Sequence, residues 1–212
     1  MSTIKAVLFD MDGVLIDAKD WHYVALNKAL SLFGMEISRY DHLVTYDGLP
    51  TRQKLEMLTL ECGLPRELHA FINEIKQQYT LDEVHQKCKP MFAHEYALTR
   101  LKAEGMKLAV CSNSIRKTVE IMLEKAMIID HFDMLLSNQD VTKAKPDPEI
   151  YVTCMSKLGV SPHETLILED NDHGIKAAIA SGAHVLPVQT VSDVNYFNIS
   201  ERIELINKGA TC

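Results

Sequence analysis

The sequence predicts an α/β protein with a Rossmann-like, doubly wound parallel sheet and an inserted all-helical domain. Short apolar runs alternate with helical periodicity along much of the 212-residue chain, and each run is too short for a helix and ends at polar or glycine positions. Such alternation is typical of right-handed crossovers in a parallel sheet with helices on both faces. One long segment after the first run shows helical periodicity only, which indicates an insertion.

Five apolar runs are expected to form the strands: 6–9, 108–111, 132–136, 166–168 and 184–188. Three helices are expected between them, over 115–125, 148–158 and 174–180. Gly159 follows the second of these helices and Gly182 lies just beyond the third. Both glycines are expected to end their helices, because glycine readily adopts the left-handed conformation of a helix C-terminus.

The insertion is expected to be a helical cap domain over residues 18–89, and the core domain to comprise residues 1–17 and 90–212. The apolar residues that recur in the insertion at helical spacing are Val24, Ala25, Leu26, Ala29, Leu30, Leu55, Met57, Leu58, Leu60, Leu68, Phe71, Ile72, Ile75 and Tyr79. This spacing places apolar side chains on one face of each helix. No long Gly/Ser linker is present, so short hinges are expected near residues 17–20 and 87–90.

Charge, hydropathy and cysteine content disfavour several classes of protein: nucleic-acid-binding, membrane-spanning and secreted proteins. The chain has 29 acidic and 22 basic residues, a net charge of −7, which disfavours binding to a nucleic-acid backbone. No apolar run reaches the ~18 residues of a membrane span, and the first residues do not resemble a signal peptide. An odd number of cysteines, five in all, without Cys-x-x-Cys spacing favours reduced thiols in the cytoplasm. These patterns leave the oligomeric state open.

Polar residues follow the predicted strands where an open parallel sheet binds its ligands. They are Asp10, Asp12, Ser112, Asn113, Lys145, Glu169, Asp170 and Asp172. Several carboxylates cannot stay ionised side by side without a cation. Because the donors are oxygens without a histidine cluster, Mg²⁺ is the expected metal. A lysine and a serine beside the metal would supply an electrostatic cradle for a phosphoryl group.

The spacing of Asp10 and Asp12 suggests a division of labour between two carboxyl groups. On an extended segment, residues two apart point the same way, and Gly13 allows a sharp turn directly after them. One carboxylate can attack phosphorus, while the other protonates the leaving oxygen and later activates water. A calcium-binding loop is disfavoured because it needs glycine at its sixth position, whereas Gly13 stands at the fourth.

Four motifs occur in order along the chain: residues 9–14 (FDMDGV), Ser112 after an apolar run, residues 145–149 (KPDPE), and residues 169–170 (ED) followed by Gly174 and Ser181-Gly182. Together they resemble the motifs of haloacid dehalogenase-like phosphohydrolases. The resemblance covers nearly the whole chain and is clearest to the subgroup of β-phosphoglucomutase-like enzymes and phosphoglycolate-type phosphatases that carry a helical cap.

This resemblance implies roles for the acidic residues. Asp10 would be the nucleophile and a metal ligand. Asp12 would be the general acid and base, with its backbone carbonyl on the Mg²⁺ ion. Asp170 would complete the protein ligands, helped by Glu169 directly or through water.

The resemblance also implies which residues bind the substrate. Ser112 and Lys145 would hold the transferring phosphoryl group beside the backbone of Asn113. In the cap, Arg52 would clamp a distal phosphate or carboxylate, and His22 and Lys76 occupy positions similar to functional ones in relatives. Ala18 stands where relatives often carry a serine or threonine.

The predicted function is a Mg²⁺-dependent phosphatase that hydrolyses a small phosphorylated metabolite through an aspartyl-phosphate on Asp10. The alternative is a sugar-phosphate phosphomutase of the β-phosphoglucomutase type, which shares the first half of the chemistry. A phospho-accepting signalling receiver is disfavoured. Receivers lack a helical insertion, and their acceptor aspartate follows a middle strand rather than the first strand of the chain.

Overall fold

The computed structural model describes residues 3–209. The chain divides into two compact units. The α/β unit contains the residues up to Asp17 and those from Lys89 onward, and the helical insert contains Ala18–Cys88.

The α/β unit is built on a five-stranded, wholly parallel sheet with the order β3-β2-β1-β4-β5. The strands are β1 (Ala6–Phe9), β2 (Lys107–Cys111), β3 (Met134–Leu136), β4 (Thr165–Glu169) and β5 (His184–Pro187). Phe9 of β1 is paired with Val110 of β2 and Leu168 of β4. The strand order reverses between β1 and β4, and open parallel sheets generally bind ligands at the carboxyl ends of the strands at such a point. The predicted fold class is confirmed.

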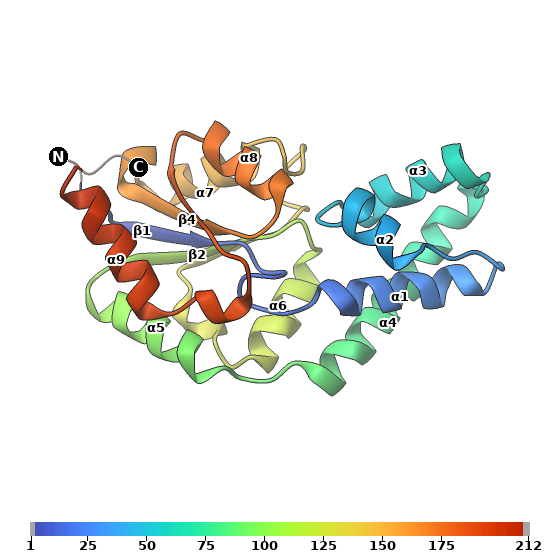
Figure 1. The fold of residues 1–212 in the computed structure, drawn as a ribbon, viewed down its shortest axis with the longest axis horizontal. Coiled ribbons are helices and arrows are strands. Elements are labelled where there is room, and N and C mark those ends of the chain that lie inside the picture. The colour runs from blue at the N-terminus through green and yellow to red at the C-terminus, as the bar shows by residue number, and fades with distance from the viewer. Residues whose placement is uncertain (1–2, 210–212) are drawn as a thin grey trace. The chain divides into compact units, whose positions relative to one another are not determined.

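Helices cover both faces of the sheet (Figure 1). The helices α5 (Phe92–Ala103), α6 (Arg116–Lys125) and α9 (Tyr196–Asn207) lie on one face, and α7 (Glu149–Leu158) and α8 (Asp172–Ala180) lie on the other. Short 3-10 turns occur at Ile129–His131, Pro162–Glu164 and Val191–Asp193. All four residues of β1 are fully buried, as a continuous apolar run predicts for a central parallel strand.

Two element boundaries differ from the prediction by two residues, while the other predicted boundaries of strands and helices differ by at most one. Strand β3 begins at Met134 rather than at 132, and the preceding Asp133 uses its carboxylate to accept a hydrogen bond from the backbone N–H of Leu108 at 2.8 Å. Helix α8 begins two residues before Gly174, because the side chain of Asn171 accepts a hydrogen bond from the N–H of His173 and caps the helix.

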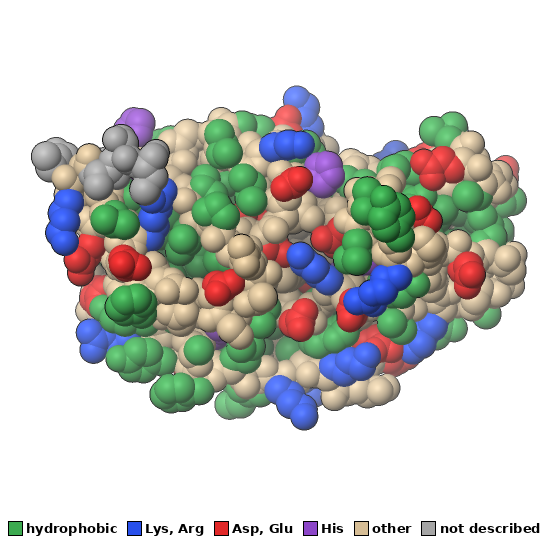
Figure 2. Space-filling model, in the orientation of Figure 1, with side chains coloured by type: hydrophobic (Ala, Val, Ile, Leu, Met, Phe, Trp, Pro, Cys, Tyr) green, Lys and Arg blue, Asp and Glu red, His purple; other side chains and the backbone are tan. Residues whose placement is uncertain are grey.

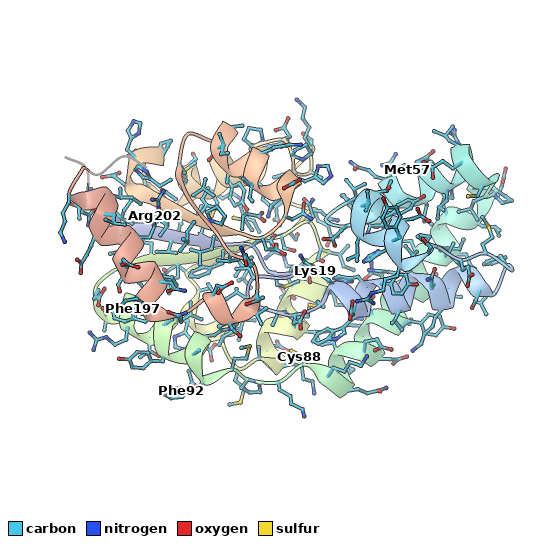
Figure 3. All side chains as sticks on the ribbon, viewed as in Figure 1. Lys19, Met57, Cys88, Phe92, Phe197 and Arg202 are labelled. Carbon is cyan, nitrogen blue, oxygen red and sulfur yellow. The ribbon has the colours of Figure 1, made fainter. Side chains whose placement is uncertain are left out.

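The helices α5 and α9 were not among the predicted elements. Each exposes a large aromatic side chain, Phe92 at 80% and Phe197 at 70%, and both project from the flank of the α/β unit in Figure 3. An exposed phenylalanine on the polar side of a helix weakens the apolar periodicity on which the prediction relied.

The visible surface of the α/β unit carries both signs of charge. Acidic and basic side chains are interspersed on it in Figure 2. Within residues 3–209, no helix has the length and apolar character needed to cross a membrane. Cys62, Cys88, Cys111 and Cys154 are free thiols, while Cys212 lies outside the described residues.

The helical insert contains α1 (Lys19–Ser31), α2 (Arg39–Asp41), α3 (Thr51–Cys62) and α4 (His69–Lys87), with a π-helical turn at His42–Tyr46 and a 3-10 turn at Arg66–Leu68. Helix α1 packs along α4. The chain enters α1 at Lys19 and leaves α4 at Cys88, both labelled in Figure 3.

An apolar cluster stabilises the insert, and it comprises Leu26, Ala29, Leu30, Ile37, Tyr46, Leu55, Leu58, Leu64 and Ile72. Two residues expected on the apolar faces are instead exposed: Leu60 at 79% and Phe71 at 49%. Leu60 lies two residues after the buried Leu58, about 200° around the helix at 3.6 residues per turn, so it faces away from the cluster.

Candidate active site

The candidate site begins with Asp10, the first residue after β1. Its backbone N–H donates to the carbonyl of Leu168 at 3.0 Å, which continues the pairing of β1 with β4 and brings Asp10 to the carboxyl end of the sheet. The chain then turns at Gly13, whose φ is 91° and whose N–H donates to the Ile16 carbonyl at 2.7 Å. A positive φ of this size favours glycine, so the sequence after Asp12 is adapted to this turn.

Lys145 links two of the predicted acidic residues. Its Nζ donates to Asp10 Oδ1 at 2.6 Å, to Glu169 Oε1 at 2.6 Å and to the carbonyl oxygen of Cys111 at 2.8 Å. An ammonium group has three donors, and these three acceptors match that number. Lys145 is only 3% exposed, so the pair of ionic contacts is screened little by solvent.

The segment that carries Lys145 is held from both sides. Its backbone N–H donates to Asn113 Oδ1 at 3.2 Å, which joins it to the loop after β2. On the other side, the Glu149 carboxylate accepts from the backbone N–H groups of Thr142 and Lys143, each at 2.9 Å. These bonds fix the lysine backbone between β2 and the start of α7.

Three carboxylates converge at the carboxyl ends of β1 and β4. Asp10, Glu169 and Asp170 each offer an oxygen, and these oxygens lie within 4.8 Å of one another. Both carboxylate oxygens of Asp170 are buried. A compact set of anionic oxygen donors fits a hard divalent cation such as Mg²⁺.

The electrostatics of this cluster also favour an added cation. Burial raises the pKa of Asp10 well above its usual value, and the neighbouring carboxylates Glu169, Asp170 and Asp12 raise it further, against the opposing effect of Lys145. Burial alone would lower the pKa of Lys145, but Asp10 and Glu169 outweigh it and raise that pKa. Lys145 therefore stays protonated, and one positive charge faces several carboxylates.

Asp12 lies near this cluster but makes a different contact. Its Oδ2 accepts a hydrogen bond from Ser114 Oγ at 2.8 Å, and its carboxylate is not in the group formed by Asp10, Glu169 and Asp170. The N–H of Ser114 donates to Ser112 Oγ at 3.0 Å, and Ser112 is 1% exposed. The turn after β2 thus holds both the predicted phosphoryl-binding serine and a hydroxyl that orients Asp12.

The predicted substrate residue Arg52 belongs to the helical insert, where it is exposed near the start of α3. Within the insert, Lys76 is 6% exposed and its Nζ lies 3.2 Å from His22 Nδ1. Lys54, which sequence reasoning did not single out, is also buried, at 7% exposure. It lies beside the buried Leu55 and one turn before the buried Leu58 on α3.

Gly174 packs directly against the Glu169 carboxylate, where no larger residue fits. A Cβ at this position would lie 1.9–2.2 Å from the carboxylate atoms of Glu169. Gly174→Ala is therefore expected to displace Glu169 and weaken Mg²⁺ binding by ~10-fold or more, although alanine is the better helix former by ~1 kcal/mol. Calorimetric titration with Mg²⁺ measures the effect.

Lys176→Ala on the exposed side of the same helix is the matched control, because it alters helix propensity without touching Glu169. If Gly174→Ala bound Mg²⁺ as tightly as the unchanged protein, the close packing of Glu169 against α8 would have no bearing on the metal site.

Sequence reasoning missed two residues of the site: Ser114, which donates to Asp12, and Tyr151, which donates to Glu169. Ser114 lies two residues beyond the predicted Ser112. The Tyr151 hydroxyl donates to Glu169 Oε1 at 2.6 Å. Tyr151 occupies an inward position of a helix, where a phenol needs a buried hydrogen-bond partner, and that requirement was the available signal.

The chain is similar in sequence to known proteins. The chain is 30% identical over 181 residues to hexitol phosphatase B from Escherichia coli, covering 84% of this chain and 80% of that protein. It is 27% identical over 194 residues to β-phosphoglucomutase from Bacillus subtilis, covering 87% and 83%.

The fold agrees as well. The crystal structure of β-phosphoglucomutase from Clostridium difficile superposes with a TM-score of 0.83 at 22% identity, covering 95% of this chain and 98% of that one. The sequence model of the haloacid dehalogenase-like hydrolase family matches residues 7–188 of this chain. The match runs from the second residue of β1 to the residue after β5 and includes every acidic residue of the cluster, so the chain belongs to the haloacid dehalogenase-like hydrolase family.

Proposed function

We propose that this protein is a Mg²⁺-dependent phosphatase that hydrolyses a small phosphorylated metabolite through an aspartyl-phosphate on Asp10. The observation that carries the proposal is the compact set of Asp10, Glu169 and Asp170, of which Asp10 and Glu169 accept hydrogen bonds from the ammonium group of Lys145. Asp10, Glu169 and Asp170 would hold the ion, together with the backbone carbonyl of Asp12. When bound, it offsets negative charge on the phosphoryl oxygens.

In the first step, an Asp10 carboxylate oxygen forms a bond to phosphorus while the bond between phosphorus and the leaving oxygen breaks. Asp12, in its protonated form, gives its proton to that leaving oxygen, which departs as an alcohol. The Ser114 hydroxyl holds the Asp12 carboxyl group in place. Ser112, Lys145 and the backbone of Asn113 bind the transferring phosphoryl group.

In the second step, water attacks phosphorus and the bond to the Asp10 oxygen breaks. Asp12, now a carboxylate, takes the proton of the attacking water. Inorganic phosphate leaves, Asp10 regains its carboxylate and Asp12 regains its proton. The cycle therefore needs no further reactant.

We further propose that Arg52 binds an anionic group of the substrate, since an exposed guanidinium near a helix start is suited to a phosphate or carboxylate. The protein would act in the cytoplasm, a proposal supported by the buried free thiols Cys111 and Cys154.

Phosphomutase activity on a sugar phosphate is the second candidate, supported by the 27% identity to β-phosphoglucomutase from Bacillus subtilis. In that reaction the phosphoryl group on Asp10 would pass to a second hydroxyl group instead of water. The two activities differ in product, so incubation with glucose 1-phosphate followed by assays for free phosphate and glucose 6-phosphate distinguishes them.

A panel of phosphorylated metabolites, assayed for phosphate release with Mg²⁺, tests the proposed function. Activity is expected to stop when EDTA removes the metal and to return when Mg²⁺ is restored, because the carboxylate cluster needs a cation to accept a phosphoryl group. Full activity in EDTA would contradict the metal requirement. Formation of glucose 6-phosphate without free phosphate would favour the mutase.

A further inference from the structure

Tyr151 places a polar group deep inside the α/β unit. It is fully buried in α7, within an apolar cluster that includes Leu8, Ala109 and Cys154. A hydroxyl group in such surroundings is costly unless it is hydrogen-bonded. Its bond to Glu169 Oε1, 2.6 Å long, joins a phenol to a carboxylate, which is a strong, charge-assisted pair.

The same side chain also contacts Lys145, the other partner of Glu169. The Lys145 Nζ lies 4.8 Å from the centroid of the Tyr151 ring, within the range of a cation–π interaction. Tyr151 therefore supports the Lys145–Glu169 pair twice, through its hydroxyl group and through its ring.

These contacts define the orientation of the Glu169 carboxylate. Oε1 accepts from both Tyr151 and Lys145, and Oε2 accepts from the backbone N–H of Asp170 at 3.2 Å. Gly174 closes the space on another side. Phenylalanine would fill the volume of Tyr151 equally well, but it would leave Oε1 with one donor fewer.

We propose that Tyr151 is a positioning residue for the metal site, which fixes Glu169 in the orientation that binds Mg²⁺ beside Asp170. The assignment rests on the proposed function, because it assumes that this carboxylate cluster binds Mg²⁺. Outer partners of metal ligands act in this way in metal sites generally.

Tyr151→Phe removes the hydroxyl group and keeps the ring. The expected result is a loss of Mg²⁺ affinity of ~10-fold or more, measured by calorimetric titration of the substrate-free protein. The Mg²⁺ concentration for half-maximal phosphate release should rise by the same factor, whereas kcat at saturating Mg²⁺ should change little. A purely structural role would lower thermal stability without changing Mg²⁺ affinity.

Tyr46→Phe is a matched control in the helical insert. Tyr46 is also buried, at 3% exposure, and its hydroxyl donates to Glu61 Oε2 at 2.7 Å, so the same kind of bond is lost in the unit that does not contain the cluster. This variant is expected to lose comparable thermal stability and to keep its Mg²⁺ affinity.

A second comparison ties the effect to Glu169. In a Glu169→Gln background, adding Tyr151→Phe should weaken Mg²⁺ binding no further, because the oriented carboxylate is already gone. Independent, additive effects would overturn the proposal, as would equal Mg²⁺ affinity in Tyr151→Phe and the unchanged protein. A Tyr151→Phe variant that cannot fold would also overturn it, since the residue would then be required for the fold.

The results separate this proposal from the proposed function. Phosphate release with unaltered Mg²⁺ affinity in Tyr151→Phe would leave the phosphatase and remove the role of Tyr151. If Tyr151→Phe weakened Mg²⁺ binding in a protein that releases no phosphate from any substrate, the role of Tyr151 would stand and the phosphatase proposal would fail. A protein that binds no Mg²⁺ at all would overturn both.

Discussion

Asp10→Asn is expected to reduce phosphate release by at least ~10³-fold, since an amide cannot replace a carboxylate as the nucleophile. The variant keeps the size of the side chain. Because the pKa of Asp10 is raised by burial and by its acidic neighbours, removing its charge should not lower the thermal midpoint of the metal-free protein. Phosphate release and a thermal melt in EDTA, measured on the same sample, separate lost chemistry from lost folding.

The exposed Asp130 in the α/β unit provides the control for this experiment. Asp130→Asn makes the same chemical change away from the cluster and should retain full activity. Turnover by Asp10→Asn at a rate comparable to that of the control would exclude Asp10 as the nucleophile, and the aspartyl-phosphate with it.

Lys145→Met is expected to lower both activity and stability. Removing one partner of a buried ion pair costs ~3–5 kcal/mol, because the remaining charges are left uncompensated. Here two carboxylates, on Asp10 and Glu169, would lose their ammonium group. Denaturant unfolding in EDTA measures the loss of stability, and phosphate release should fall by ~10²-fold or more, as it does when one group that stabilises charge in the transition state is lost.

The pH dependence of this loss has a defined sign. A carboxyl group whose pKa is raised in the folded protein, as that of Asp10 is, holds a proton in the folded state that the unfolded chain has released. Stability therefore falls as pH rises above the ordinary carboxyl pKa of ~4. Metal-free Lys145→Met should be most destabilised at neutral pH and recover part of its stability in acid.

Lys102→Met is the matched comparison. Lys102 also forms a 2.6 Å ion pair, with Asp133, but both side chains are more than a third exposed. Exposed pairs contribute at most ~1 kcal/mol, so this variant should be only slightly less stable at every pH. Similar losses in the two lysine variants would show that burial of Lys145 has no special electrostatic effect.

The fold and the acidic cluster could be predicted because both depend on patterns that are local in the sequence. The run 6–9 was predicted as a strand and forms β1 with the same limits. Once the strands are known to be parallel, the residues after β1 and β4 must share one edge of the sheet, which is why Asp10, Glu169 and Asp170 were expected together.

The remaining features depend on contacts that no local pattern encodes. The sequence places Tyr151 on the inward face of α7 but does not indicate what its hydroxyl contacts. Only the structure shows that the hydroxyl donates to Glu169. In the insert, the exposed Arg52 and the buried Lys54 are two residues apart on one helix. Which of them faces outward is set by how α3 rotates against its neighbours, and this was not available from residue type.

The three hydrogen bonds of Lys145 have a consequence for the order of events at the site. Since Asp10, Glu169 and the Cys111 carbonyl already take all three ammonium protons, an incoming phosphoryl oxygen can only enter by exchange with one of them. A phosphoryl group bound by Lys145 would thus break one of these hydrogen bonds as it forms a new one. Under the proposed role of Lys145, substrate binding and the loss of one of these hydrogen bonds would therefore be a single event.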